Sequence, residues 1–318
     1  MGYQSGVRLT VFACNANPEL AKRIAGELGT GLGDSEVTRF SDGEINMRIN
    51  QAVRGQDVFI IQPTCEPVNE NLMELLIMID ALRRASADRI TAIIPYFGYA
   101  RQDRKARARD PISAKLVANL ITAAGASRML AVDLHCEQLQ GFFDIPVDNL
   151  SCLKMFINYY KDKFGSFDDI VTASPDLGGV ARTRRFAEGL DTPMAIVEKR
   201  RTKPNVSEVM NVIGDVKDKR VIMMDDIIDT AGSITGAAAA LKKHGAREVY
   251  ACATHAVLSG RAVQRIGASA LDEVLVTDTI PLPDAKRAPK IKTISVAPLL
   301  ASAASLIHEG LSISKLFD

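Results

Sequence analysis

Short apolar runs alternate with amphipathic segments along most of the first half of the chain. Runs bounded by polar or turn residues are typical of buried strands, and they occur at 8–14, 57–63, 89–97 and 128–135. Apolar residues at helical spacing predict helices at 18–29, 69–85 and 113–125. The stretch 36–49 differs, because Asp42 and Gly43 mark the turn of a hairpin.

The second half repeats this alternation. Strands are expected at 169–174, 194–199, 220–226 and 248–254, and helices at 180–190 and 233–245. Strands separated by helices indicate parallel pairing, so the fold class is α/β with mainly parallel sheets flanked by helices. A chain of 318 residues exceeds one typical core, and the pattern breaks near Leu150. We therefore expect two similar domains, residues 1–150 and 151–318.

Composition and charge exclude several classes of protein. The net charge of +1 argues against broad binding of nucleic acid. The five cysteines are widely spaced and include no C-x-x-C pair, which favours reduced thiols in a cytoplasmic protein. We expect no membrane association, since no apolar run is long enough to span a bilayer and the N-terminus shows no secretory pattern.

Acidic and small residues follow the apolar part of the strand at 220–226. Asp225, Asp226 and Asp229 follow the stretch RVIMM at 220–224, and open α/β sheets bind ligands beyond the carboxyl ends of their strands, so these aspartates are functional candidates. Residues 230–233 form a small-residue turn at a helix start, where backbone N–H groups can hold a phosphate. A phosphorylated sugar satisfies both features. The alternative is a loop whose aspartates only cap a helix.

Basic residues gather at two other strand ends. Segment 96–115 carries Arg101 and Arg104, which could clamp a polyphosphate, although most charged loops are simply solvated. Lys199 is the last residue of the strand expected at 194–199, and Arg201 lies two residues beyond it; both could stabilise a transferring phosphoryl group. The alternative there is an exposed basic hairpin end.

These motifs carry a family resemblance. The stretch 221–233, VIMMDDIIDTAGS, resembles the loop that phosphoribosyltransferases and ribose-phosphate diphosphokinases use to bind phosphoribosyl diphosphate. From end to end the chain is similar to the diphosphokinases, also called PRPP synthetases, of the hexameric, phosphate-activated class. The resemblance implies two phosphoribosyltransferase-like domains, and the last helix of the chain would be able to pack back on the N-terminal domain.

The resemblance also implies an activity, transfer of the diphosphoryl group of Mg-ATP to the C1 hydroxyl of ribose 5-phosphate, giving 5-phosphoribosyl 1-diphosphate and AMP. Its ATP-binding residues would be Phe40, Asp42, Gly43, Glu44, Arg101, Gln102 and Arg104. Ribose 5-phosphate would be bound by Asp225, Asp226, Asp229, Thr230, Ala231, Gly232 and Ser233. Lys199 and Arg201 would be catalytic, and His135 and Asp176 would bind magnesium, although alone they read as a structural histidine and an N-cap.

Regulation and assembly are implied in the same way. Inorganic phosphate would activate the enzyme. The chain would form a homo-oligomer, which is a hexamer in this class. An inhibitory nucleotide site would include Arg48, Ser312, Ser314 and Phe317. In one departure from the family pattern, Ser233 stands where threonine is usual, and both residues supply a hydroxyl.

Two other functions remain as alternatives. A phosphoribosyltransferase would share the 225–233 loop, but the basic segments at 101–107 and 198–202 would have no clear role in it. A non-catalytic, synthetase-like regulatory subunit would be expected to carry interrupted motifs, whereas those of this chain are intact.

Overall fold

The computed structural model describes residues 7–200 and 209–316; of residues 199, 200 and 209 it describes the backbone alone. It divides into two compact units. Unit 1 comprises Met1–Ser151, Thr279–Pro281 and Ser295–Asp318, and unit 2 comprises Cys152–Asp278 and Leu282–Ile294. Two short segments from the end of the sequence therefore belong with the first half of the chain.

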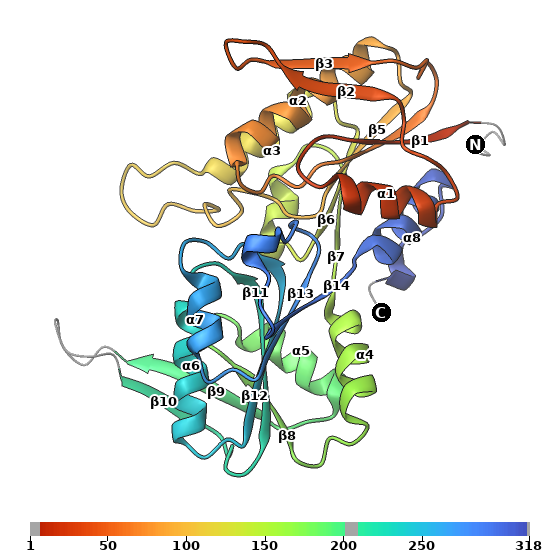
Figure 1. Ribbon diagram of the computed structural model, residues 1–318. Helices are drawn as coiled ribbons and strands as arrows, with labels where there is room; N and C mark the ends of the chain where they lie inside the picture. Colours follow the sequence, from red (N-terminus) through yellow and green to blue (C-terminus); the bar gives the residue numbers. More distant parts are fainter. Residues whose placement is uncertain (1–6, 201–208, 317–318) are drawn as a thin grey trace. The chain divides into compact units, whose positions relative to one another are not determined.

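Unit 1 contains a five-stranded parallel sheet in the order β1-β4-β5-β6-β7 (Figure 1). Its strands are β1 (Leu9–Ala13), β4 (Asp57–Ile61), β5 (Arg89–Ile94), β6 (Arg128–Val132) and β7 (Val147–Leu150). A separate antiparallel hairpin is formed by β2 (Ser35–Arg39) and β3 (Ile45–Ile49). Through β3, the hairpin contacts helix α2 (Val68–Arg84).

The helices of unit 1 pack as two pairs. Helices α2 (Val68–Arg84) and α3 (Ser113–Ala124) pack together and contribute to one core with strand residues such as Phe12, Ile60 and Ile94. Helix α1 (Pro18–Glu27) contacts β1, β4 and α8 (Ala297–His308), so the last helix of the chain packs within unit 1. Short 3-10 turns lie at η1 (Glu137–Phe142) and η3 (Ser314–Leu316).

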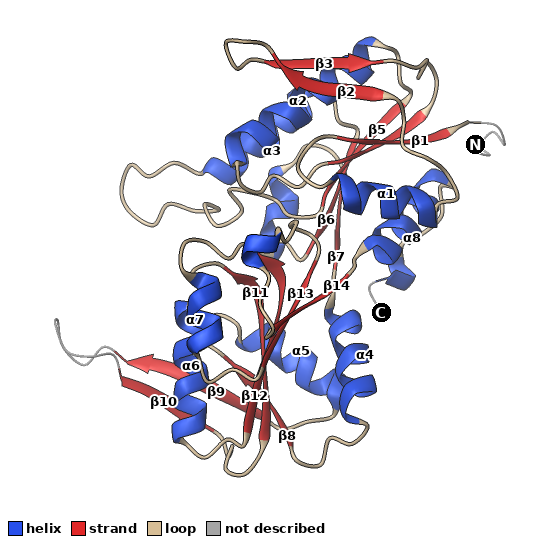
Figure 2. Cartoon of the chain, in the orientation of Figure 1, coloured by secondary structure: helices blue, strands red, loops and turns tan. Residues whose placement is uncertain are grey.

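Unit 2 contains a seven-stranded sheet in the order β10-β9-β8-β11-β12-β13-β14. All pairs are parallel except β10 (Val209–Ile213) with β9 (Met194–Arg200). The other strands are β8 (Ile170–Ser174), β11 (Arg220–Ile228), β12 (Glu248–Ala256), β13 (Glu273–Thr277) and β14 (Ile291–Ile294). Figure 2 shows these strands, in red, between blue helices. The predicted α/β fold with parallel sheets flanked by helices is confirmed.

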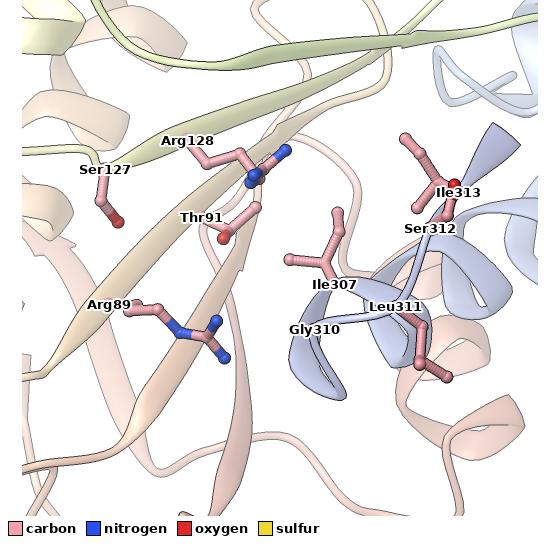
Figure 3. Close-up of a pocket in the computed structure, with 9 residues that line it drawn as sticks. All are labelled: Arg89, Thr91, Ser127, Arg128, Ile307, Gly310, Leu311, Ser312 and Ile313. Carbon is pink, nitrogen blue, oxygen red and sulfur yellow. The ribbon is translucent and has the colours of Figure 1, made fainter. Parts of the chain in front are cut away.

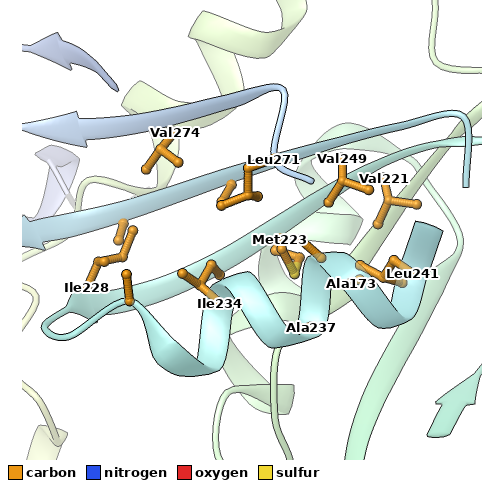
Figure 4. Packing of buried hydrophobic residues seen from close by; sticks show 14 of the residues in the cluster. Ala173, Val221, Met223, Ile228, Ile234, Ala237, Leu241, Val249, Leu271 and Val274 are labelled. Carbon is orange, nitrogen blue, oxygen red and sulfur yellow. The ribbon is translucent and has the colours of Figure 1, made fainter. Parts of the chain in front are cut away.

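Helices cover both faces of the second sheet. Helices α4 (Leu153–Phe164) and α5 (Val180–Leu190) lie on one side, and α6 (Gly232–Lys243) and α7 (Ala262–Ala268) on the other; η2 (Asp284–Lys286) is a short turn (Figure 1). The apolar residues Ile234, Ala237 and Leu241 of α6 recur at helical spacing and are buried against the sheet (Figure 4). This packing fixes the N-terminus of α6 beside the end of β11.

Within the part of the chain that the structure describes, no helix is both long enough and apolar enough to cross a membrane.

Candidate functional sites

The acidic pair lies within β11 rather than after it. The strand continues to Ile228 because β12 pairs with it that far, whereas the pairing with β8 ends at Met223. Asp225 is partly exposed and Asp226 is 5% exposed. The pair thus occupies a stretch of strand where the neighbour on one side has already ended.

Arg182, in the first turn of α5, meets both acids. Its Nη1 lies 3.1 Å from Asp225 Oδ1 and 3.0 Å from Asp226 Oδ1. The backbone N–H of Asp226 also donates to Asp225 Oδ1, at 2.8 Å. Burial, followed by the hydrogen bond and charge of Asp226, raises the pKa of Asp225 to about 7, although Arg182 acts in the opposite direction.

This raised pKa predicts a pH-dependent stability difference. From about pH 4 to pH 7 the folded chain holds the Asp225 proton more strongly than the unfolded chain, so the side chain lowers stability increasingly as pH rises through that window. Asp225→Asn cannot titrate there. Thermal unfolding of the two proteins should show that the stability of the variant relative to wild type increases with pH up to about pH 7 and is constant above it. A difference independent of pH would contradict the shift.

The predicted phosphate turn connects β11 to α6. Ala231, at the N-cap of α6, has a left-handed backbone with φ of 60°, and its side chain has no acceptor for the first N–H groups of the helix. Gly232 and Ser233 follow it and are exposed. The turn is held from outside, because Arg265 of α7 donates to the carbonyl of Thr230 at 2.8 Å. An exposed helix N-terminus of this kind is suited to an anion.

The hairpin turn carries an exposed aromatic ring beside acidic side chains. Phe40 is 53% exposed, and its backbone N–H donates to the carbonyl of Glu44 at 2.8 Å. Asp42 Oδ1 accepts from the N–H of Glu44 at 3.1 Å, and Gly43 adopts a φ of +95°, which favours glycine. The turn therefore holds these side chains at the tip of the hairpin, in solvent.

The arginine segment forms a loop between β5 and α3. Its start is set by Gly98, because a Cβ there would lie 2.3 Å from the carbonyl oxygen of Thr64. Gln102 Oε1 accepts from the Ser113 hydroxyl at 2.5 Å, which ties the loop to the start of α3. Arg101 and Arg104 are exposed.

The two predicted metal ligands belong to different units. His135, in unit 1, follows β6 and is exposed; the preceding Leu134 N–H donates to Asn149 Oδ1 at 2.9 Å. Asp176, in unit 2, is exposed, and its Oδ1 accepts from the N–H of Gly179 at 2.9 Å, as an N-cap would. Among residues 7–200 and 209–316, no group of three or more histidine, cysteine, aspartate or glutamate side chains could hold a metal ion.

The remaining predicted residues are only partly described. Lys199 lies in β9, where its backbone pairs with Met210, and its side chain is not described. Arg201 and Phe317 lie outside the described residues. Arg48 is exposed on β3, whereas the hydroxyls of Ser312 and Ser314 lie 2.8 Å apart after α8.

A cavity of about 450 Å³ in unit 1 was not predicted (Figure 3). Arg89, Thr91, Ser127 and Arg128 line it from the starts of β5 and β6, and residues 307 and 310–313 line it from the end of α8 and the turn beyond. Arg89 forms an ion pair with the buried Asp57 and donates to the carbonyl of His308 at 3.2 Å, and Arg128 pairs with Asp148. No single motif indicated this cavity, because its walls are far apart in sequence.

The sequence matches two family descriptions. Residues 9–125 match the N-terminal domain of ribose phosphate pyrophosphokinase, and residues 170–318 match the phosphoribosyl synthetase-associated domain. Ribose-phosphate pyrophosphokinase of Caldanaerobacter subterraneus subsp. tengcongensis is 61% identical over 309 residues, covering 97% of this chain and 98% of that protein. The Bacillus subtilis protein of the same name is 56% identical over 310 residues, covering 98% and 97%.

A solved structure agrees with these matches. The crystal structure of phosphoribosylpyrophosphate synthetase from Mycobacterium smegmatis has a TM-score of 0.91 and 45% sequence identity, and it covers 95% of this chain and 99% of its own. The similarity therefore extends to both units.

Proposed function

Because the chain belongs to the ribose-phosphate pyrophosphokinase family, we propose that it makes 5-phosphoribosyl 1-diphosphate and AMP from ATP and ribose 5-phosphate, for nucleotide biosynthesis. The C1 hydroxyl of the sugar attacks the β-phosphorus of ATP, and AMP leaves. The observation that carries this proposal is the similarity of the chain to ribose-phosphate pyrophosphokinases over nearly its whole length. Segment 225–233, which a phosphoribosyltransferase would share, supports the sugar substrate, because its paired carboxylates and exposed helix N-terminus offer partners for sugar hydroxyls and for a phosphate.

Ribose 5-phosphate is assigned to unit 2. The turn Asp229–Ser233 holds the 5-phosphate through backbone N–H groups and the hydroxyls of Thr230 and Ser233, helped by the dipole of α6. Asp225 and Asp226 accept hydrogen bonds from the ribose hydroxyls. Because binding fixes the sugar at both ends, the C1 hydroxyl is oriented before the reaction begins.

ATP is assigned mainly to unit 1. Arg101, Gln102 and Arg104 bind the polyphosphate, and exposed arginines suit this role because the guanidinium fork matches phosphate oxygens. At the hairpin tip, the Phe40 ring offers a stacking surface to the adenine, while Asp42, Gly43 and Glu44 offer polar contacts. Lys199 and Arg201 stabilise the charge on the transferring diphosphoryl group.

Family membership implies a metal cofactor, and we propose that it is Mg²⁺. His135 and Asp176 would contribute to its binding; both are exposed, and neither lies in a closed protein cage. The ion would supply neutralisation of the polyphosphate charge. Magnesium in proteins usually has few protein ligands and retains several of its water ligands.

The regulation and assembly that we propose are those of the hexameric, phosphate-activated class that the sequence resembles. We propose a hexamer that is activated by inorganic phosphate and inhibited by a nucleotide at Arg48, Ser312, Ser314 and Phe317. The contact between the hydroxyls of Ser312 and Ser314 supports a shared role for these two residues. The five cysteines are widely spaced and include no C-x-x-C pair, which supports our proposal of a cytoplasmic location. We also propose that residues 1–150 and 151–318 are two related phosphoribosyltransferase-like domains, with the last helix, α8, packed on the first of them.

The identity of the nucleotide product tests the function. Incubation with ATP, magnesium and ribose 5-phosphate should yield AMP, measured by chromatography, and omission of the sugar should abolish it. An ordinary kinase would release ADP instead. Absence of any nucleotide product would favour a phosphoribosyltransferase or a regulatory subunit and would overturn the proposal.

A further inference from the structure

Arg182 takes its place through the connection from β8 to α5. The hydroxyl of Ser174 donates to the carbonyl of Asp176 at 2.7 Å, and the N–H of Gly179 donates to Asp176 Oδ1 at 2.9 Å. A Cβ on Gly179 would lie 3.0 Å from the Ser174 hydroxyl, so the turn is closely packed. These contacts fix the first turn of α5, and hence the point from which the Arg182 side chain extends.

The sheet leaves space for this side chain at the acidic pair. Beyond Met223, β11 has no further rung with β8, and α5 packs against both strands. Arg182 approaches in that region and is partly buried, with 25% of its side chain exposed. One nitrogen lies within 3.1 Å of an oxygen of each carboxylate, so a single guanidinium bridges the two acids.

Among the residues that the structure describes, the main charges that act on Asp225 come from two elements. Asp226, on the same strand, disfavours a second negative charge beside it, and Arg182 of α5 compensates it. Ala253 stands opposite Asp225 on β12, and the first turn of α6 carries no acidic residue. Loss of Arg182 would therefore leave two neighbouring carboxylates with the main compensating charge removed.

We propose that Arg182 is a positioning residue for ribose 5-phosphate, which orients Asp225 and Asp226 together so that they accept hydrogen bonds from neighbouring sugar hydroxyls. This inference rests on the proposed function, which assigns the sugar to the pair. It also predicts the chemical class of ligand, a furanose phosphate with adjacent hydroxyls. The positive charge also favours the ionised pair, the form that only accepts hydrogen bonds.

The test compares three variants with wild type. Arg182→Met removes the charge. Arg182→Lys retains it on a side chain that is one bond shorter, so that its nitrogen falls short of the position from which Nη1 contacts both carboxylates. Arg184→Met makes the same change as Arg182→Met at an exposed position of the same helix. The dissociation constant of ribose 5-phosphate is measured by calorimetry, without ATP, from pH 6.5 to 8.5. Thermal unfolding checks that each variant is folded.

The expected results differ in their dependence on pH. Arg182→Met should weaken binding about 100-fold at pH 7 but only about tenfold at pH 8.5, because the pKa of Asp225 rises further without its cation. Arg182→Lys should weaken binding about tenfold at every pH, since it keeps the charge but not the bridge. Arg184→Met should bind as wild type does. Each dissociation constant is compared with that of wild type at the same pH, so the titration of the substrate phosphate affects both equally and cancels.

Three results would overturn the inference: unchanged binding by folded Arg182→Met, a loss in that variant that is equal at all pH values, or wild-type binding by Arg182→Lys. If Arg182→Met does not fold, Arg182→Lys decides alone, because a changed pH profile in that variant would also count against the inference. Failure of the wild type to bind ribose 5-phosphate would instead remove the proposed function.

Discussion

Replacement of Gly232 by aspartate should leave the chain folded and weaken ribose 5-phosphate binding about 100-fold or more. Gly232 is the first residue of α6, and the nearest atom to a Cβ built there is Thr230 Oγ1, at 3.7 Å, so a side chain fits. A carboxylate at a helix N-terminus is favourable for the helix itself. The same charge repels a phosphate in the turn, so stability and binding should change in different directions.

Calorimetry and thermal unfolding separate these two effects. Gly232→Asn is the matched control, because asparagine has the same size without the charge. It should retain most of the affinity, whereas Gly232→Asp should lose it while unfolding at the same or a higher temperature. Equal affinity of the two variants for ribose 5-phosphate would exclude the 229–233 turn as the phosphate site.

Replacement of Lys199 by alanine should lower turnover about 100-fold or more, with a much smaller change in the Michaelis constant for ATP. A cation that acts on charge developing in the transition state affects the rate more than ground-state binding. Lys199 is the next-to-last residue of β9 and follows the apolar run at 194–197. Its position thus matches the strand-end rule for functional residues in α/β sheets.

Lys243→Ala provides the control for this prediction. Lys243 is an exposed lysine in the last turn of α6, so its removal changes the net charge equally, and turnover should be unaffected. Steady-state release of AMP measures both variants. Wild-type turnover by Lys199→Ala would remove this lysine from the mechanism.

The sequence predicted the acidic pair but not the residue that meets it. Apolar runs and helical spacing indicate the central strands because their core contacts repeat at regular intervals, as for Ile234, Ala237 and Leu241 of α6. Segment 180–190 holds three arginines of equal appearance, and only the packing of α5 on β11 selects Arg182. The apolar residues Phe186 and Leu190 follow Arg182 at the helical spacing of four and eight residues, and this spacing is the sequence signal that could have placed Arg182 on the buried face of the helix.

Features that depend on contacts between residues far apart in the sequence could not be predicted from local patterns. Arg89 and Arg128 each begin a strand and are separated by an entire helix in sequence, yet both line the same cavity with the turn after α8. The return of α8 to unit 1 depends on burial of its apolar residues beside α1, which no local motif encodes. Likewise, β11 extends through the acidic pair because β12 continues beside it, so the strand end could not be located from the aspartates alone.

The fate of the β-phosphorus of ATP tests the central claim most directly. With ATP labelled at that position, together with magnesium and ribose 5-phosphate, the account predicts that the label moves to the sugar and that one labelled sugar diphosphate forms for each AMP. Label that stays in the nucleotide fraction as ADP would contradict diphosphoryl transfer.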